Sequence, residues 1–361
     1  MDSPIPKVQK GALIENPGEN AQIRIQSDVP VGTPGRHEIL VKLSFTGVCG
    51  SEIRALSGWG AYNPIVGHEG VGTVVKVGDQ VDAALMNKRV GVKWLYSACG
   101  LCNACKRGFS NNCPKQVNTG RHVPGTLQQY MIADARYVTE IPEDVPGEVA
   151  APLLCAGLTM AGAVSKLDAS LAENDWVVIS GSGGGLGHLG VQIASRLRSY
   201  RVIAVDSGKT KRELSLESGA HEFIDFVEEN VEERVKELTG EGAAAVVVVS
   251  GSEQAFTMAP SLVRNMGLIV TVGLPRNDFH IPIGASLLSA RGLTVTGVAV
   301  GTEDQMVELL QQASDRKILP KVTVVDFDQV GTVLEGLKKQ DITGRVVVRI
   351  PWAFGLGQPK I

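Results

Sequence analysis

The sequence has few aromatic residues, few cysteines and no excess of positive charge. Phe, Trp and Tyr together make up 5% of the 361 residues, and the formal net charge is -3. A general nucleic-acid-binding protein needs a basic surface and usually aromatic side chains for base stacking, so both shortages disfavour that class. Because the apolar fraction is 43%, the chain still has ample material for hydrophobic cores. Its length predicts about two domains.

Long apolar runs and export signals are also missing. The longest uninterrupted apolar run, Ala243–Val249, is far shorter than the roughly 18 residues that cross a bilayer, and it predicts a buried strand. The first residues lack a basic segment followed by an apolar one, so we predict no secretory signal. We therefore expect a cytoplasmic protein with no membrane partner, in which clustered cysteines are metal ligands or catalytic groups rather than disulfides.

Two kinds of pattern follow each other along the chain. Up to about residue 150, short alternating runs such as 39–45 and 71–77 are bounded by turn residues, which predicts a β-rich domain. From there to about residue 297, apolar runs alternate with helical patterns such as 228–238, which predicts a parallel sheet covered on both faces. The strands of this sheet are expected at 176–180, 201–205, 243–249, 268–272 and 293–296.

Four of the six cysteines lie close together, with the spacing C-x2-C-x2-C-x7-C: Cys99, Cys102, Cys105 and Cys113. Four thiolates within such a short segment can close a tetrahedral shell around Zn²⁺, which is the pattern of a structural zinc site. An iron–sulfur cluster uses the same four ligands and stays open as an alternative, as do unrelated thiols or disulfides. A nucleic-acid-binding zinc ribbon is disfavoured, because the loop carries a single aromatic residue in an acidic chain.

The two remaining cysteines, Cys49 and Cys155, are far apart in the sequence, and His68 lies between them. Two thiolates and one imidazole would leave a fourth position for water or substrate, as in a catalytic zinc site. Alone, the three residues are a weak signal, since a lone buried cysteine is more often part of a core. Their flanking motifs strengthen the signal: Gly47-Val48-Cys49, Gly67-His68-Glu69-Gly70 and Leu154-Cys155-Ala156-Gly157.

A glycine-rich turn follows the strand expected at 176–180. Its glycines have the spacing Gly181-x-x-Gly184-x-x-Gly187 rather than strict G-x-G-x-x-G. Glycines let the backbone approach a pyrophosphate at the start of a helix. Asp206 ends the next strand, where a carboxylate can bond both ribose hydroxyls and repel a 2′-phosphate. The pattern favours NAD(H), and the positive charges of neighbouring Lys209 and Arg212 leave NADP(H) open.

In this order, the two cysteine sets, the glycine turn and Gly344-Arg345 resemble a zinc-dependent medium-chain alcohol dehydrogenase of the fungal (yeast-type) class. The resemblance implies an α/β fold. A β-rich GroES-like catalytic domain would comprise residues 1–158 and 299–361, and a doubly wound parallel-sheet Rossmann domain would comprise residues 159–298. It also implies hydride transfer between alcohols and aldehydes or ketones with NAD(H), two zinc ions per chain, one catalytic and one structural, and a homotetramer or homodimer.

The resemblance also implies the roles of individual residues. The catalytic set would be Cys49, Ser51, His68, Glu69 and Cys155. Within it the two cysteines and the histidine would bind zinc, Glu69 would lie behind the metal, and Ser51 would take the alcohol proton. The clustered cysteines would bind the structural zinc, and Trp59 and Trp94 would line the substrate pocket. The coenzyme would be bound by Gly181, Gly184, Gly185, Leu186, Gly187, Asp206, Lys211, Val272, Leu274, Val298 and Arg345.

Three positions beside the catalytic set depart from the family pattern. Gly50 replaces a basic residue that contacts the pyrophosphate, and Glu52 replaces the Asp that orients the metal-site histidine. Arg54 stands at the position of a proton-relay histidine, and a guanidinium cannot act as a base. We hypothesise an enzyme retuned for a substrate larger than ethanol, acting mainly as an aldehyde or ketone reductase. The alternatives are an NADPH-using carbonyl reductase of fungal specialised metabolism and a non-catalytic NAD(H)-binding homologue.

Overall fold

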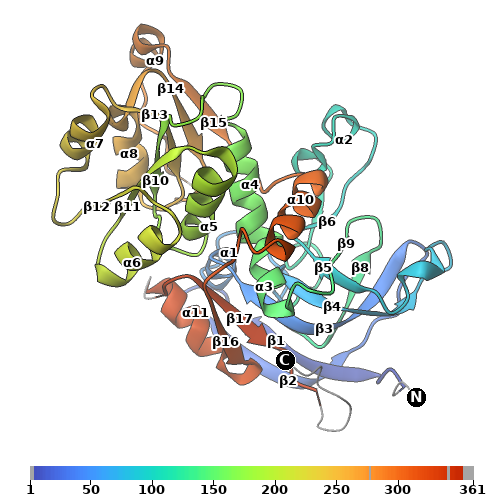
Figure 1. Cartoon of the computed structure of the whole chain (residues 1–361). Helices are drawn as coiled ribbons and strands as arrows, with labels where there is room; N and C mark the ends of the chain where they lie inside the picture. Colours follow the sequence, from blue (N-terminus) through green and yellow to red (C-terminus); the bar gives the residue numbers. More distant parts are fainter. Residues whose placement is uncertain (1–3, 276–277, 340–341, 353–361) are drawn as a thin grey trace.

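The computed structural model describes residues 4–275, 278–339 and 342–352, so the end of the expected 299–361 segment lies outside the described residues. Figure 1 shows two lobes, one built around strands β10 to β15 and the other around β1 to β5 with β16 and β17. Each lobe has its own large sheet, one of six strands and one of seven. The α/β fold class and the two-part architecture expected from the sequence are confirmed.

The six-stranded sheet is parallel and has the strand order β12-β11-β10-β13-β14-β15. This is the strand order of a doubly wound Rossmann fold, in which ligands bind where the order reverses, at the carboxyl ends of the strands. Every residue of β13 is buried, as expected for a central strand covered on both faces. The strands are β10 (Trp176–Ser180), β11 (Arg201–Asp206), β12 (Glu222–Asp225), β13 (Ala243–Val248), β14 (Val263–Thr271) and β15 (Thr294–Gly297).

Helices connect these strands. The helix expected at 228–238 is α7 (Val231–Thr239), and it starts three residues later than expected because Asn230 is the N-cap, whose side chain accepts a hydrogen bond from Glu233 N. The other connecting helices are α5 (Gly187–Gln192), α6 (Lys209–Glu217), α8 (Glu253–Leu262) and α9 (Ala285–Arg291), and a π-helical turn, Ile193–Leu197, continues α5.

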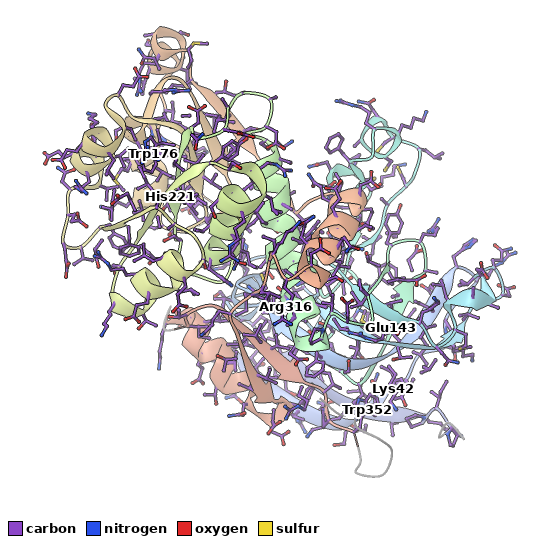
Figure 2. The ribbon with its side chains drawn as sticks, viewed as in Figure 1. Lys42, Glu143, Trp176, His221, Arg316 and Trp352 are labelled. Carbon is purple, nitrogen blue, oxygen red and sulfur yellow. The ribbon has the colours of Figure 1, made fainter. Side chains whose placement is uncertain are left out.

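The seven-stranded sheet contains strands from the first part and from the last part of the chain. Strand β17 pairs antiparallel with β3, so the last part of the chain returns to the lobe formed by the first part. Beyond β17, Trp352 Nε1 donates to Leu43 O at 2.9 Å, and Lys42 Nζ lies 4.3 Å from the Trp352 ring centre (Figure 2). The strands are β3 (Glu38–Val48), β4 (Gly70–Val77), β5 (Arg89–Val92), β8 (Tyr130–Asp134), β9 (Thr139–Glu140), β16 (Val322–Asp326) and β17 (Arg345–Arg349).

Smaller elements complete this lobe. Two two-stranded sheets pair β1 (Val8–Glu15) with β2 (Gln22–Pro30), and β6 (Leu95–Ser97) with β7 (Val117–Asn118). The helices are α1 (Ser51–Leu56), α2 (Asn103–Lys106), α10 (Glu303–Ser314) and α11 (Val330–Lys338), with 3₁₀ turns at Ala83–Leu85, Ser110–Asn112 and Phe327–Gln329. Helix α10 opens with a complete capping box, in which Thr302 and Gln305 each bond the other's backbone N–H.

A long apolar helix runs between the lobes. It consists of α3 (Gly147–Pro152), a π-helical turn (Leu153–Gly157) and α4 (Leu158–Ser165). By length and composition this stretch could cross a membrane, with a mean hydropathy of 1.5, which corrects the expectation that no segment approaches that length. However, 78% of its most apolar window is buried inside the protein. It contacts β3 in one lobe and α5 in the other, so it is the core helix between them (Figure 1).

Candidate active site

Four side chains from three separate segments converge in one buried cluster. Cys49 follows β3, His68 and Glu69 directly precede β4, and Cys155 lies in the π-helical turn of the core helix. One ligand atom from each of the four lies within 4.8 Å of all the others. A π-helical turn widens the helix and turns one side chain out of the regular α-helical direction, and such turns are frequent at functional sites. Here the π-helical turn directs the Cys155 side chain towards the other three residues.

The spacing of these atoms fits a tetrahedral zinc site. Cys49 Sγ lies 3.9 Å from Cys155 Sγ, and His68 Nε2 lies 3.2 Å from Cys155 Sγ. Ligands at normal zinc distances are about 3.8 Å apart for two sulfurs and about 3.5 Å apart for a sulfur and a nitrogen. Both sulfurs belong to free cysteines. Among the described residues Glu69 Oε2 is buried with no hydrogen-bond partner, as expected of an oxygen that faces a cation.

Glu52 holds two of these residues in place. Its Oε1 lies 3.0 Å from His68 Nδ1, and its Oε2 accepts a hydrogen bond from the backbone N–H of Cys49 at 2.6 Å. Burial is the largest single effect and would lower the pKa of His68, but Glu52 and Cys49 together outweigh it and raise that pKa well above its ordinary value. By bonding Nδ1, Glu52 leaves Nε2 facing the cluster. Although one methylene longer than Asp, this glutamate can therefore orient the histidine.

Glu69, the carboxylate of this cluster, also pairs with Arg345. The Arg345 guanidinium donates from Nη2 to Glu69 Oε1, and both side chains are almost fully buried. Burial raises the pKa of Glu69 to about 7, and the opposing charge of Arg345 is the largest effect that lowers it. Gly47 leaves room for this carboxylate, because a Cβ there would collide with Glu69. The sequence motif around Cys49 thus includes a glycine that the buried ion pair requires.

The pKa values of the two cysteines shift in opposite directions. A hydrogen bond with Cys155 is the main cause that lowers the pKa of Cys49 well below its ordinary value, and the same contact raises the pKa of Cys155. Cys49 is therefore the more acidic thiol of the pair. A cation in the cluster would favour the thiolate of Cys155 as well, because metal ligation deprotonates a coordinating thiol. The donor set thus fits zinc by its chemistry as well as by its distances.

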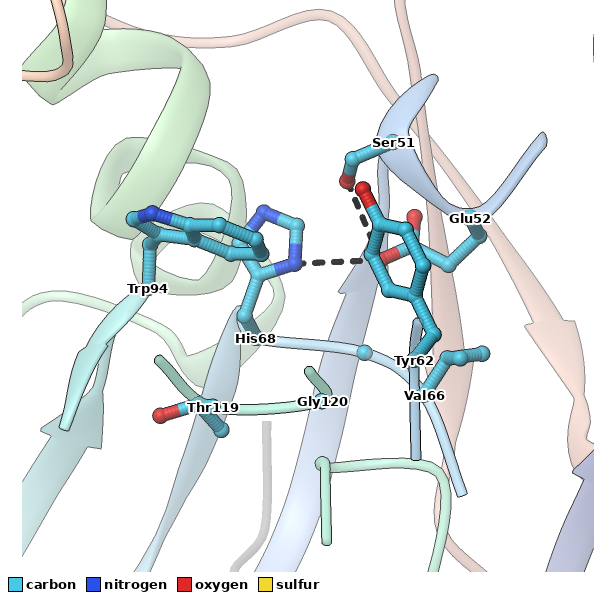
Figure 3. A pocket seen from close by; sticks show the side chains of 9 residues that line it. Ser51, Glu52, Tyr62, Val66, His68, Trp94, Thr119 and Gly120 are labelled. Atoms are coloured by element: carbon cyan, nitrogen blue, oxygen red, sulfur yellow. Dashed lines mark hydrogen bonds and ion pairs between the residues drawn. The ribbon is translucent and has the colours of Figure 1, made fainter. Parts of the chain in front are cut away.

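A small hollow opens beside His68 (Figure 3). Ser51 and Glu52 lie on one side of it and Trp94 on the other, with the Trp94 and His68 rings edge to face at 5.2 Å. Trp59, expected to line the pocket with Trp94, does not line this hollow; it is 43% exposed and stacks under Arg54. Other lining residues that sequence reasoning missed are Tyr62, Val66 and Thr119, which follow no recognisable motif.

The four clustered cysteines also come together, on a loop around α2. The Cys102–Cys105 and Cys99–Cys113 sulfurs are 3.5 Å apart, and the Cys102–Cys113 sulfurs are 3.9 Å apart. These separations are close to those of a tetrahedral Zn–S₄ shell, about 3.8 Å, and are far longer than a disulfide bond of about 2.05 Å. All four thiols are free, so the disulfide alternative is wrong.

The glycine turn lies at the carboxyl end of β10, where the sheet order reverses. Gly181 has a φ of 80°, which favours glycine, and a Cβ on Gly187 would collide with Gly181 O. Asp206 Oδ2 accepts a hydrogen bond from Gly183 N at 2.9 Å, and Lys211 Nζ lies 3.2 Å from its Oδ1. Gly184, Gly185 and Leu186 complete the turn before α5. Asp206 thus holds the glycine turn in place from the end of β11.

The remaining expected coenzyme residues lie at the ends of other strands. Val272 follows β14 and is buried, Leu274 is 66% exposed, and Val298 follows β15 and is partly buried. Arg345 lies against Gly185, where its Nη1 is 3.0 Å from the position a Cβ would occupy. Arg54 reaches towards the same side from the other lobe and donates to Pro275 O at 3.3 Å.

Comparisons with known families match both parts of the chain. Residues 35–143 match the family described as "Alcohol dehydrogenase GroES-like domain", and residues 185–315 match "Zinc-binding dehydrogenase". Alcohol dehydrogenase 2 of Emericella nidulans is 37% identical, aligned over 95% of this chain and 98% of that protein. The alcohol dehydrogenase of Schizosaccharomyces pombe is 38% identical over the same shares of the two chains.

Solved structures agree with this. An acetophenone reductase from Geotrichum candidum in complex with NAD superposes with a TM-score of 0.83 at 27% identity, covering 96% of this chain and 98% of that chain. The alcohol dehydrogenase from Aeropyrum pernix superposes with a TM-score of 0.86 at 27% identity, covering 94% of this chain and all of that chain. These matches favour an enzyme over the non-catalytic alternative. The chain belongs to the zinc-dependent medium-chain alcohol dehydrogenases and is an oxidoreductase that acts on CH–OH groups with NAD(P).

Proposed function

We propose that the enzyme interconverts an apolar alcohol and its aldehyde or ketone, with NAD(H) as coenzyme. The observation that carries this proposal is the cluster of Cys49, His68 and Cys155, of which His68 also lines a hollow. Three ligands with one open side are the arrangement of a catalytic zinc. When bound, the zinc ion polarises the substrate oxygen and the nicotinamide ring exchanges a hydride with the substrate carbon.

Ser51 is the proposed residue that moves the substrate proton. Its hydroxyl lines the hollow next to His68, and Ser51 Oγ lies 3.4 Å from Glu52 Oε1. A hydroxyl can accept a proton from the substrate while passing its own onward. Arg54, one turn along the same helix, cannot take that proton because a guanidinium is always charged. The proton would therefore leave from Ser51 through the coenzyme ribose or water to solvent.

Asp206 supports NAD(H) over NADP(H). Its carboxylate is buried at the end of β11 and is held by Gly183 N and Ser207 N, each at 2.9 Å. A fixed negative charge at this position repels a 2′-phosphate. The nearby cations have other contacts: Lys211 pairs with Asp206 itself, Lys209 lies 3.9 Å from Glu213, and the Arg212 guanidinium lies over the Phe223 ring. This arrangement disfavours the alternative of an NADPH-using carbonyl reductase.

Side chains around the hollow support an apolar substrate. Tyr62, Val66 and Trp94 present ring and aliphatic surface next to the hydroxyl of Ser51. Trp59 lies outside this set, so Trp94 is the one of the two tryptophans expected to line the pocket that does so. Burial of each additional methylene is worth about 0.8 kcal/mol, so affinity should rise along a series of longer substrates until the hollow is filled.

The wider organisation of the enzyme is also proposed. Residues 1–158 and 299–361 would form the catalytic domain and residues 159–298 the coenzyme domain. The pairing of β17 with β3 supports this division, since it returns the last part of the chain to the first lobe. Cytoplasmic location and a homodimer or homotetramer remain proposals that rest on the family.

A steady-state assay tests the proposed function. The zinc-loaded enzyme is given NADH or NADPH with aldehydes and ketones of increasing chain length, and NAD⁺ with the matching alcohols. We expect turnover with NADH to exceed turnover with NADPH, and kcat/KM to rise from acetaldehyde to longer or aromatic carbonyl compounds. Asp206→Asn should reduce the preference for NADH over NADPH. A preference for NADPH, or kcat/KM that falls steadily with chain length, would contradict the proposal.

A further inference from the structure

His188 is a fully buried histidine that the reaction described above does not use. It is the second residue of α5, directly after the glycine turn, and has 0% exposed surface. Its Nδ1 lies 2.8 Å from Gly184 O, and its Nε2 accepts a hydrogen bond from the backbone N–H of Lys321 at 3.1 Å. Since a backbone N–H can only donate, these partners place the proton on Nδ1, which donates to Gly184 O.

The imidazole is therefore neutral and oriented by both of its neighbours. Burial lowers the pKa of His188 to about 4, and the charge of Arg345 contributes to the lowering. The side chain joins two segments that are far apart in the sequence, the glycine turn and the segment Leu319–Lys321 that leads into β16. A buried group with both hydrogen bonds satisfied and one tautomer specifies the relative position of the groups it bonds.

Further hydrogen bonds connect Lys321 to the candidate catalytic cluster of Cys49, His68, Glu69 and Cys155. Lys321 O accepts a hydrogen bond from Arg345 N at 2.8 Å, and the Arg345 guanidinium pairs with Glu69. The same guanidinium lies against Gly185 of the turn. Gly184 O is thus connected through His188, Lys321 and Arg345 to a carboxylate of the candidate catalytic cluster.

Glycine turns need such external support. Gly183 and Gly184 have no side chains of their own to pack, and Gly183 N is held by Asp206 on one side of the turn. His188 holds the next residue, Gly184, from the opposite direction along the chain. Because a pyrophosphate is bound mainly by backbone N–H groups, the orientation of these two peptides decides how well the turn receives it.

We propose that His188 is a positioning residue for coenzyme binding, which fixes the peptide at Gly184 and ties the glycine turn to the segment Leu319–Lys321, where Lys321 O accepts a hydrogen bond from Arg345 N. This inference rests on the proposed function in that the turn is taken to bind the pyrophosphate of NAD(H). His188 itself contacts neither the coenzyme nor the substrate in this proposal. The effect would act through the position of the turn, and so would alter coenzyme affinity more than the turnover of bound substrate.

Two substitutions separate the two hydrogen bonds of His188. His188→Gln keeps an acceptor near the Nε2 position for Lys321 N and loses the donor to Gly184 O. His188→Asn keeps a donor near the Nδ1 position and loses the acceptor. We expect H188Q and H188A to raise the Kd for NADH about five- to tenfold, which is the loss of one hydrogen bond. H188N should regain most of that affinity, and kcat at saturating NADH should change less than about twofold in all three.

Gln192 provides the matched control. It lies one turn further along the same helix, is buried, and exchanges two hydrogen bonds with Leu319, its Nε2 to O and its Oε1 from N, both at 2.9 Å. Gln192→Leu thus detaches α5 from the same segment without touching the glycine turn. We expect NADH to bind to Q192L with the same Kd as to the unchanged protein.

The measurement is a fluorescence titration with NADH on zinc-loaded protein, with zinc content and thermal midpoint measured for every variant. Equal losses of affinity in Q192L and H188Q would overturn the inference, since the effect would then come from the junction between segments rather than from the turn. An unchanged Kd in H188A would overturn it as well. Failure of the unchanged protein to bind either NADH or NADPH would overturn the proposed function, and this inference with it.

Discussion

The two cysteine clusters fit the same metal but are assembled in opposite ways. The closed cluster, Cys99, Cys102, Cys105 and Cys113, comes from one short loop, and backbone groups support its sulfurs: Cys102 N lies 3.4 Å from Cys99 Sγ, and Lys115 N lies 3.4 Å from Cys113 Sγ. A loop of this kind needs only its own residues to form a zinc shell.

The open cluster, Cys49, His68, Glu69 and Cys155, depends instead on distant parts of the chain. Its supports are the charged side chains of Glu52 and Arg345, one beside it on α1 and the other on β17. Its ligands meet only after the core helix has packed against the seven-stranded sheet. The closed cluster therefore belongs to local structure and the open cluster to the whole fold, which predicts that substitutions in them will have different consequences.

Removing a ligand of the open cluster should have the largest effect on activity. We expect Cys155→Ser to lower kcat by about a thousandfold or more. Without the metal, the transition state loses several kcal/mol of charge stabilisation, and each 1.36 kcal/mol lowers the rate about tenfold. The Kd for NADH, measured by fluorescence, should change little, since Cys155 is remote from the glycine turn in the sequence and on a different element. Zinc analysis should fall from about two ions to about one per chain.

Cys49→Ser is the matched variant, with the same atom exchange on a different element of the same cluster. Both variants should lose activity alike. Full turnover by either one would mean that the open cluster is not the site of the reaction.

A chelator should remove zinc from the two clusters at different rates. The open cluster adjoins a hollow, whereas all four positions of the closed shell are filled by thiolates from one loop, so a chelator should remove one zinc first. We expect activity to disappear with the first equivalent of zinc while far-ultraviolet circular dichroism stays unchanged. Readdition of zinc should restore activity. Loss of both ions in a single kinetic phase would contradict the difference proposed between the clusters.

Glu52 tests whether the open cluster depends on its side-chain support. We expect Glu52→Gln to lower kcat or zinc affinity about 10- to 100-fold, the range for a residue that orients a metal ligand. The physical reason is that the neutral amide holds His68 Nδ1 and Cys49 N less strongly than the carboxylate does. Stopped-flow zinc release and steady-state kinetics measure the two effects.

Asp134→Asn is the control for this prediction. Asp134 is buried like Glu52 and makes a charged contact with Arg136, but it lies on β8 and contacts no ligand of either cluster among the described residues. Its turnover should stay within about twofold of the unchanged enzyme. Equal losses in the two variants would mean that Glu52 matters only for folding.

The contrast also explains how far the sequence could be interpreted. The closed cluster is predictable from spacing alone, because its four ligands and their backbone supports lie within one loop. The β-strand at 176–180 is likewise a local pattern and has the predicted bounds. The start of α7 was missed by three residues because the cap at Asn230, a single side-chain contact, decides it.

The open cluster could not be assembled from spacing, since nothing local says that Cys49, His68 and Cys155 meet. Only the flanking motifs and the family resemblance pointed to it. Tyr62 and Thr119 had no signal at all, because their place at the hollow depends on loops whose path is set by tertiary packing. The same holds for His188, whose partners at Gly184 and Lys321 are distant in sequence from each other.

The closed cluster should give the smallest effect on chemistry. Cys113 is the fully buried cysteine of its cluster, and its sulfur lies 3.5 Å from that of Cys99 and 3.9 Å from that of Cys102. Cys113→Ser should release one zinc and lower the thermal midpoint by roughly 5–10 °C, as expected for a loss of about 3 kcal/mol. The kcat of the remaining folded enzyme should stay within about twofold, because the loop contributes no side chain to the hollow. A loss of turnover as large as that of Cys155→Ser, at a temperature where the protein is still folded, would show that the two clusters act as one unit and that their separation into local and fold-dependent sites is wrong.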